Sequence, residues 1–231
     1  MIIGNGLLAR AFDLYTNNHN VIIFASGVSN SMEADPKQFA REFDMLMQHR
    51  GTKQKLIYFS TTSIYDTDLK ESKYIKHKLT MEKSIINNFK NYNILRLPTV
   101  VGNTTNNHTF FNGIKNSILQ GEVSVKDKAV RYLIDVDDLT KHLPTIIDTD
   151  YVGTVNTCFN NKNTARYIVS MMSEIMNKPY TEHVIEGGHD YSIDNEYFLS
   201  HIPADSVGLS KDYTYITLKK YLQSYDNILS S

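Results

Sequence analysis

The chain has 231 residues, 41% of them hydrophobic, and a formal net charge of −1, which suits one domain with a full apolar core. The near-neutral charge gives no electrostatic basis for binding nucleic acid or an anionic membrane, and no apolar run approaches the ~20 residues that span a bilayer. The lone cysteine, Cys158, cannot form an internal disulfide, and the sequence starts without a basic-then-apolar leader, so we expect a cytoplasmic protein.

Strand and helix patterns alternate along the first half of the chain. Apolar runs predict strands at residues 1–3, 21–25, 55–59 and 93–97. Amphipathic patterns predict helices between them at residues 7–15, 36–48 and 72–89. Because strands and helices follow one another repeatedly, the expected class is α/β, with a mostly parallel sheet covered by helices on both faces.

The later part of the chain is less regular. It predicts a strand-like run at residues 153–159, shorter strands at 123–126 and 132–136, and helices at 109–120, 137–147, 164–177 and 215–228. Gly121 is placed to end the first of these helices, and Asp137 to cap the second. We expect a single domain over residues 1–231, in which parts of about 103–135 and 178–212 form a small lobe that faces the substrate.

The first strand runs into a glycine turn. The stretch Gly4-Asn5-Gly6-Leu7-Leu8-Ala9 fits G-x-G-x-x-G/A at a strand-to-helix junction, where glycines let the backbone approach a pyrophosphate. Alone the pattern is weak, because a tight turn needs the same residues without a ligand. The acidic residue expected about 20 positions later, which would bind an adenosine ribose, is missing, since the second strand ends in Phe24-Ala25-Ser26-Gly27.

The most informative segment runs from residue 60 to residue 78. A strand ends there in the hydroxyl cluster Ser60-Thr61-Thr62-Ser63, and Tyr74 and Lys78 follow in a predicted helix. Residues with this spacing share one helix face, so the Lys78 ammonium is expected near the Tyr74 phenol. A phenol has a pKa of roughly 10, and a neighbouring cation lowers it. The segment therefore predicts general acid–base chemistry at a carbonyl or carbinol.

Both parts of this pattern also have simpler interpretations. Y-x-x-x-K is loose, and Tyr215 with Lys219 matches it a second time, in a predicted helix without a hydroxyl-rich strand end before it. We interpret that second pair as surface. Thr61 has an alternative role as a turn or helix-entry hydroxyl.

One cluster in the sequence resembles a metal site. Glu186, His189 and Asp190 surround a Gly-Gly loop, and the histidines of the chain show no metal-binding spacing. A solvated loop explains the cluster, so no metal is predicted.

The order of these features resembles a known family. The glycine turn, the hydroxyl strand end and the Y-x-x-x-K motif are followed by the stretches 95–102 (LRLPTVVG), 131–139 (RYLIDVDDL) and 153–156 (GTVN). Together they resemble the extended short-chain dehydrogenases/reductases, and more narrowly the NAD(P)-dependent epimerase/dehydratase group that acts on nucleotide sugars. The resemblance covers nearly the whole chain and implies a Rossmann-like fold, NAD or NADP as cofactor, and a homodimer formed by the 36–48 and 72–89 helices.

The resemblance also implies roles for individual residues. Tyr74 would be the catalytic acid/base, Lys78 its partner, and Thr61 the residue that hydrogen-bonds the reacting oxygen. The cofactor would be bound by Gly4, Asn5, Gly6, Leu7, Leu8, Ala25, Ser26, Lys78, Pro98 and Val100. The substrate would be bound by Thr62, Asn103 and Arg131, although Arg131 also has the simpler interpretation of a surface charge.

Departures from the family pattern are equally informative. Thr61-Thr62-Ser63 stands where the dehydratases of the family carry Thr-Asp-Glu, so 4,6-dehydration is not expected, and Ile3 replaces the first glycine of the family pattern. Residues 21–31 and the helix after them resemble the fourth strand and helix of the family. Its second and third strands, which carry the adenosine-binding half, then have no counterpart.

We therefore expect an NAD(P)-dependent reductase, or C4 epimerase, of a nucleotide-linked keto-sugar, in which Tyr74 exchanges a proton with the sugar oxygen. The same residues serve both reactions, so the sequence does not separate them. The alternative is a relative that binds a nucleotide or a protein partner without redox chemistry, which the missing strands and the missing ribose carboxylate motivate. The family implies a place in polysaccharide biosynthesis.

Overall fold

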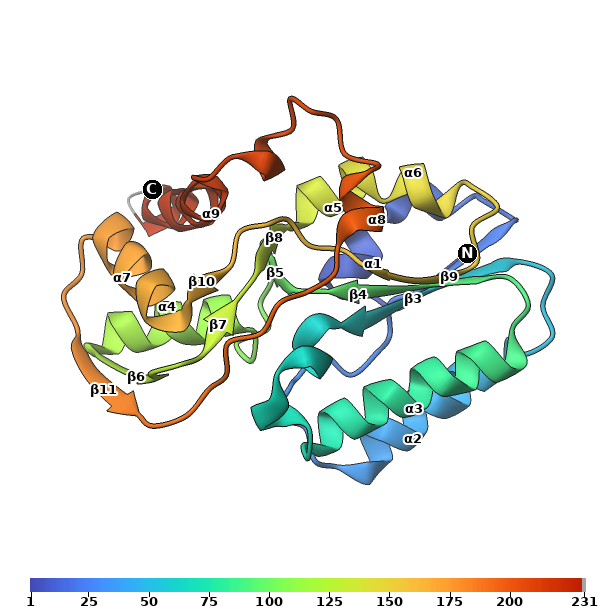
Figure 1. Ribbon diagram of the computed structural model, residues 1–231, viewed down its shortest axis with the longest axis horizontal. Coiled ribbons are helices and arrows are strands. Elements are labelled where there is room, and N and C mark those ends of the chain that lie inside the picture. The colour runs from blue at the N-terminus through green and yellow to red at the C-terminus, as the bar shows by residue number, and fades with distance from the viewer. Residues whose placement is uncertain (230–231) are drawn as a thin grey trace.

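The computed structural model describes the backbone of residues 1–229 and the side chains of residues 1–223. Five strands form the central sheet in the order β1-β2-β3-β4-β9, and each neighbouring pair is parallel (Figure 1). These strands are β1 (Ile2–Ile3), β2 (Val21–Phe24), β3 (Lys55–Thr61), β4 (Tyr92–Leu97) and β9 (Gly153–Asn156). The predicted α/β class with a mostly parallel sheet is confirmed.

Helices cover both faces of this sheet. Figure 1 shows α2 (Pro36–Met47) and α3 (Lys73–Asn88) side by side beneath it, with α1 (Leu7–Ala11), α5 (Val136–His142) and α6 (Pro144–Ile147) on the opposite side. Side chains alternate along β3 accordingly. Tyr58 packs with Met81 of α3, whereas Ile57 packs with Phe12 and Leu139 on the other face. Both faces are buried, which is why the strands read as continuous apolar runs.

The ends of the helices follow from local sequence signals. The Asp35 side chain accepts the Lys37 N–H at the start of α2, where Pro36 occupies the first turn. At the start of α3, Ser72 accepts the Ile75 N–H at 3.1 Å. This cap places Tyr74 in the first turn of α3, directly beside the carboxyl end of β3.

After β4, several elements extend the molecule to one side of the central sheet, whereas α5, α6 and β9 return to it (Figure 1). Three further strand pairs lie there: β5 (Thr99–Val101) with β8 (Leu133–Asp135), β6 (Glu122–Lys126) with β11 (Thr181–Ile185), and β7 (Val130–Arg131) with β10 (Asn163–Thr164). They pack with α4 (Phe110–Gln120), α7 (Ala165–Met176) and α9 (Tyr213–Leu229). The β6–β11 pair joins the two segments, 103–135 and 178–212, in which a substrate lobe was expected. The remaining elements are α8 (Glu196–Leu199) and the 3-10 turns η1 (Asp13–Tyr15), η2 (Thr62–Tyr65), η3 (Thr67–Leu69) and η4 (Val207–Leu209).

β1 is the edge strand of the central sheet. It pairs with β2, and no second strand of residues 1–229 pairs with it. Successive strands are then added in one direction, from β1 toward β9. This arrangement agrees with the expectation that the second and third strands of the resembled family have no counterpart here.

Several local predictions are confirmed or corrected. Gly121 ends α4 with a positive φ of 85°, as expected. Asp137 is not the cap of α5, because the chain turns out of β8 two residues earlier and Asp135 accepts the Asp137 N–H at 2.9 Å. The predicted 137–147 helix is two helices, because Pro144 lacks an N–H and begins α6.

Two expectations drawn from composition also have structural counterparts. Cys158 forms no disulfide, as a lone cysteine must, and its side chain is fully buried in the core. Along residues 1–229, no helix combines the length and apolar character that crossing a membrane requires.

Candidate active site

A pocket of about 600 Å³ opens at the carboxyl ends of β1, β2 and β3, the edge at which parallel sheets bind ligands. The glycine turn and the end of β2 form one wall, and the end of β3 and the first turns of α3 form another. The sequence-predicted residues that line the pocket are Gly4, Asn5, Gly6, Leu7, Leu8, Ala25, Ser26, Thr61, Tyr74, Lys78, Pro98, Val100 and Arg131. Segments far apart in the chain are thus brought to one site.

Two predicted substrate residues do not line this pocket. Thr62 is 2% exposed and packs inside the protein, because neighbouring side chains at a strand end point in different directions. Asn103 is exposed outside the pocket, and Thr104 and Asn106 from the same loop line it instead. Thr62 and Asn103 are therefore not among the residues that line this pocket.

The two glycines of the turn are needed for different reasons. Gly4 has a φ of +125°, and a Cβ there would lie 2.4 Å from the Ala25 carbonyl oxygen, so the fold itself requires glycine. Gly6 has an ordinary φ of −76°, and a Cβ there would meet no atom within 4 Å. The packing of this chain does not explain Gly6, whereas close approach of a ligand to the backbone would.

A buried carboxylate that the sequence analysis missed holds the Lys78 ammonium. Lys78 Nζ lies 3.1 Å from Glu42 Oε1 and 3.0 Å from the Tyr58 hydroxyl. Glu42 is fully buried and also accepts hydrogen bonds from the Tyr58 hydroxyl at 2.6 Å and the Val28 N–H at 2.7 Å, while His77 Nε2 lies 2.9 Å away. Burial raises the pKa of Glu42, but the Lys78 charge and these hydrogen bonds outweigh it and lower the pKa to about 2.

The Tyr74 phenol is a much weaker acid than the sequence led us to expect. Tyr74 is 8% exposed, and burial raises its pKa to about 12, with a further increase from the Glu42 charge, while a hydrogen bond with Thr61 acts in the opposite direction. The prediction that Lys78 lowers this pKa is therefore wrong, because Glu42 neutralises the ammonium within the buried network. Tyr74 is protonated at neutral pH.

Thr61 caps a turn and also lines the pocket. Its hydroxyl accepts the Ser63 N–H at 3.0 Å and so caps η2, which is the local role. The same side chain lines the pocket and shares a hydrogen bond with Tyr74, so the two predicted residues lie together. Both contacts follow from the position of Thr61, because β3 ends at this residue and the 3-10 turn η2 begins directly after it.

Arg131 forms the far wall of the pocket. Its guanidinium lies 3.6 Å from Asp66, which is buried, and 5.6 Å from the centre of the Phe110 ring. Phe110 lines the same pocket. Arg131 is thus held at the pocket by Asp66 and Phe110, rather than being an unattached surface charge.

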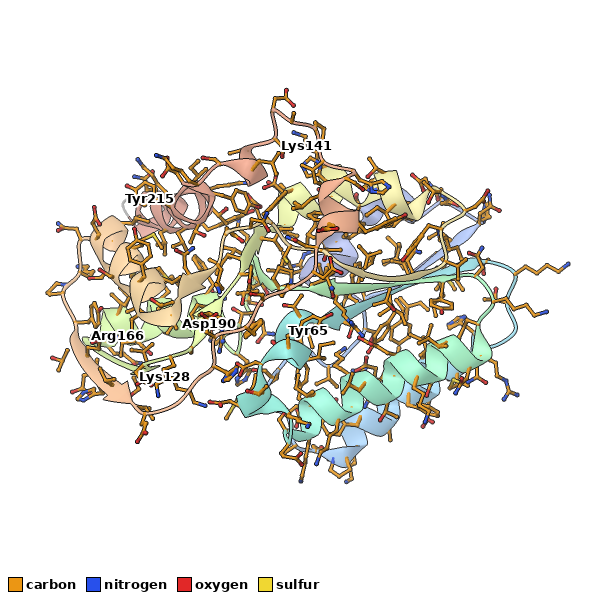
Figure 2. The ribbon with its side chains drawn as sticks, viewed as in Figure 1. Tyr65, Lys128, Lys141, Arg166, Asp190 and Tyr215 are labelled. Carbon is orange, nitrogen blue, oxygen red and sulfur yellow. The ribbon has the colours of Figure 1, made fainter. Side chains whose placement is uncertain are left out.

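The second Y-x-x-x-K pair lies away from the pocket. Figure 2 shows Tyr215 at the outer surface of α9, well separated from Tyr65 on η2. Tyr215 is 36% exposed, and the Lys219 ammonium lies 5.7 Å from the centre of its ring. The interpretation of this pair as surface is confirmed.

The sequence contains one weak indication that Glu42, which the sequence analysis missed, is buried. Glu42 lies three positions after Phe39 and four before Leu46, so it occupies the apolar stripe of α2. A carboxylate there needs a buried partner, and Lys78 and His77 of α3 supply one. Nothing in the spacing of the two helices identifies those partners before the fold is known.

Comparison with known proteins places the chain by its fold. No family model and no curated protein sequence matches it. Its structure is similar to that of dTDP-4-dehydrorhamnose reductase from Bacillus anthracis in complex with NADP, with 14% identity, a TM-score of 0.68, and coverage of 94% of this chain and 85% of that one.

Two further solved structures are similar to this chain to nearly the same extent. UDP-glucose 4-epimerase from Thermus thermophilus in complex with NAD is 13% identical, with a TM-score of 0.67 and coverage of 92% and 81%. dTDP-glucose 4,6-dehydratase from Bacillus anthracis in complex with NAD is 15% identical, with a TM-score of 0.67 and coverage of 96% and 77%. The chain thus has the Rossmann-like α/β fold that these reductases, epimerases and dehydratases share.

Proposed function

We propose that this protein is an NAD(P)-dependent reductase of a nucleotide-linked keto-sugar. The observation that carries the proposal is the convergence of Thr61, Tyr74 and Lys78 with the glycine turn on one pocket. The pocket suits an anionic dinucleotide, because the backbone at Gly6 is open and no carboxylate is among the residues that line it. The solved structures with this fold that hold NAD or NADP support the same cofactor class.

In this proposal Tyr74 is the proton donor. A bound NAD(P)H would supply the hydride for the sugar carbonyl carbon. Tyr74 gives its proton to the carbonyl oxygen as negative charge develops there, and its raised pKa keeps the phenol protonated until that moment. Thr61, already hydrogen-bonded to Tyr74, orients the same oxygen. Lys78, fixed by Glu42, is the pocket donor for ribose hydroxyls.

The protonation of Tyr74 favours reduction over C4 epimerisation. An epimerase begins by oxidising a hydroxyl, which requires Tyr74 to accept a proton. With a pKa of about 12 the phenol holds its proton at neutral pH, so it would have to lose that proton before it could act as the base. Thr62 and Ser63 supply no acidic pair for elimination of water, so dehydration is not part of the proposal.

The nucleotide of the substrate is proposed to bind at the far wall of the pocket. Arg131 stands there with Phe110, and a guanidinium pairs well with the planar phosphate groups of a nucleoside diphosphate. The lobe built around β6 and β11 would close over the sugar from that side.

Binding of the cofactor is the direct test. We expect NADH or NADPH to raise the melting temperature in a saturable way at micromolar concentration, since a ligand that binds the native state stabilises it. Gly6→Val should abolish this shift and leave the unliganded melting temperature nearly unchanged, because the new side chain enters open space. Gly113→Ala, a glycine outside the pocket, is the matched control and should bind normally.

One observation supports a second candidate function. β1 is an edge strand, so the half of the fold that would hold a second nucleoside is missing from residues 1–229. A protein that binds a nucleotide or a protein partner without redox chemistry would tolerate this loss. No melting shift at millimolar NADH or NADPH would favour that function and contradict the reductase.

We also propose that the protein is a homodimer formed by α2 and α3. Leu79 and Ile86 share the outward face of α3 and are exposed, as is Phe43 on α2. The double substitution Leu79→Glu and Ile86→Glu is expected to give a monomer in light scattering. Leu119→Glu, on the exposed surface of α4, should leave the dimer intact. A monomeric parent protein would contradict the proposal.

A further inference from the structure

The position of the glycine turn at the edge of the sheet has a consequence for ligand binding. A doubly wound sheet is built from two mononucleotide-binding halves and binds a dinucleotide where the strand order reverses, so that each nucleoside lies over strands on its own side. In this chain the order β1-β2-β3-β4-β9 does not reverse within residues 1–229. The structure therefore offers one of the two halves.

The walls of the pocket agree with this topology. They extend from the glycine turn across the ends of β2 and β3 to Pro98 and Arg131, all on one side of β1. Toward the other side the pocket ends at Gly4, Asn5 and Gly6, which are exposed. A nucleoside placed beyond these residues would have no strand beneath it.

The charges that line the pocket indicate where a phosphate would lie. Lys78 is paired with Glu42, and Arg131 is near Asp66. Arg41 of α2 also lines the pocket, and no carboxylate of the described side chains forms an ion pair with it.

The Arg41 guanidinium is held beside the glycine turn by Ser26, two residues after the end of β2. Its Nη1 donates to the Ser26 hydroxyl at 3.1 Å and its Nη2 to the Ser26 carbonyl oxygen at 3.0 Å. Ser26 directly follows Ala25, against which Gly4 is packed. A guanidinium forms strong charge-assisted hydrogen bonds with phosphate oxygens. Because Arg41 is anchored beside the glycine turn, its guanidinium is placed to bind a phosphate there.

From these observations we infer that the pocket binds its cofactor through the nicotinamide ribose and the adjoining phosphate, with Arg41 as the phosphate contact, and that the adenosine lies outside the protein. The inference rests on the proposed function and makes it more specific, since the binding free energy of the cofactor would come from contacts with the nicotinamide half of the dinucleotide. It also means that the chain does not discriminate between NADH and NADPH, which differ on the adenosine ribose.

A ligand series tests the inference without any turnover. Dissociation constants are measured by calorimetry for NADH, NADPH, reduced nicotinamide mononucleotide and AMP. We expect NADH and NADPH to agree within about threefold, and the mononucleotide to bind within about tenfold of NADH, a difference of about 1.4 kcal/mol or less. AMP should not compete with NADH at 1 mM, a concentration about a thousandfold above a micromolar constant.

The opposite outcomes overturn the inference in distinguishable ways. A mononucleotide that binds more than about a hundredfold more weakly than NADH, or AMP that competes as well as the mononucleotide, would show that adenosine has a site. In either case NADH still binds and the proposed function survives. If none of the four ligands binds, the proposed function fails and the inference fails with it.

Substitution of Arg41 tests the phosphate contact. Arg41→Ala should weaken NADH and the reduced mononucleotide alike, by about tenfold, since both carry the phosphate next to the nicotinamide ribose. Arg50→Ala removes the same charge from an exposed position just after α2 and outside the pocket, and should change neither constant. If Arg41→Ala weakened the binding of NADPH alone, Arg41 would contact the adenosine phosphate. If the substitution changed no dissociation constant, Arg41 would not belong to the site. Either result would overturn the assignment.

Discussion

Tyr74→Phe is expected to lower the rate of keto-sugar reduction by at least about a hundredfold, because it removes the proton donor from the pocket. The phenol hydroxyl shares a hydrogen bond with Thr61, so its loss should cost about 1 kcal/mol of stability and leave the fold intact. The rate is measured as oxidation of NADPH or NADH in the presence of a 4-keto-sugar nucleotide. Dinucleotide affinity, measured separately, should change little.

The second tyrosine motif provides the control for this experiment. Tyr215→Phe makes the same chemical change on the exposed face of α9 and should not alter the rate. If Tyr74→Phe retained the parent rate while remaining folded, Tyr74 would have no part in the mechanism. A loss of melting temperature in proportion to the loss of rate would point instead to a structural role.

Glu42→Ala is expected to destabilise the protein by about 3–5 kcal/mol, because it leaves the Lys78 ammonium buried without a counter-charge. The free energy of unfolding is measured by urea titration at pH 7. Glu71→Ala is the matched control, since Glu71 forms an ion pair with Lys76 but its side chain is 80% exposed. Surface pairs of this kind contribute about 0–1 kcal/mol, so the control should be nearly as stable as the parent.

A third variant distinguishes the effect of the unpaired charge on stability from the effect of altered packing. Replacing both partners, as Glu42→Leu with Lys78→Met, removes the unpaired charge and should recover a large part of the stability lost in Glu42→Ala. It should not recover catalysis, because Lys78 lines the pocket. If the double variant were as unstable as Glu42→Ala, the loss of stability would come from the altered shape of the site rather than from its charge balance.

Glu42 also predicts how stability depends on pH. Its native pKa of about 2 lies below the ordinary value of 4.5, so the folded carboxylate binds its proton less readily than the unfolded one. This contribution, about 3 kcal/mol, is therefore complete above pH 4.5 and is lost as the pH falls toward 2. Urea titrations at pH 7 and pH 3 should show the loss in the parent protein, and Glu42→Gln should show less of it. Equal pH dependence in the two proteins would contradict the assignment to Glu42.

Much of the fold was encoded in short stretches of sequence. The apolar runs at 21–25 and 55–59 became β2 and β3 because fully buried parallel strands show no polar alternation. Ser72, Pro36 and Gly121 set helix ends through their own backbone and side-chain chemistry. The convergence of Thr61 and Tyr74 was also predictable, because a strand end and the first turn of the following helix are close in any such unit.

The electrostatics of the site depended on contacts that no local pattern contains. Glu42 and Lys78 lie on different helices, 36 residues apart, and meet because α2 and α3 pack together on one face of the sheet. That contact reverses the predicted effect of Lys78 and leaves burial to raise the pKa of Tyr74 to about 12. Arg41 reaches the pocket by the same packing, since it is anchored to Ser26 of a separate segment.

The α/β class, the strands and helices, and the residue types at the pocket could be predicted from the amino-acid sequence, because each of these follows from periodicity and from neighbours along the chain. Three features became evident only in the packed fold: Lys78 is neutralised, Tyr74 keeps its proton, and Thr62 and Asn103 lie outside the pocket. These features could not be predicted because pKa values and pocket walls depend on charges and surfaces from distant segments, and their separations are set when the chain folds.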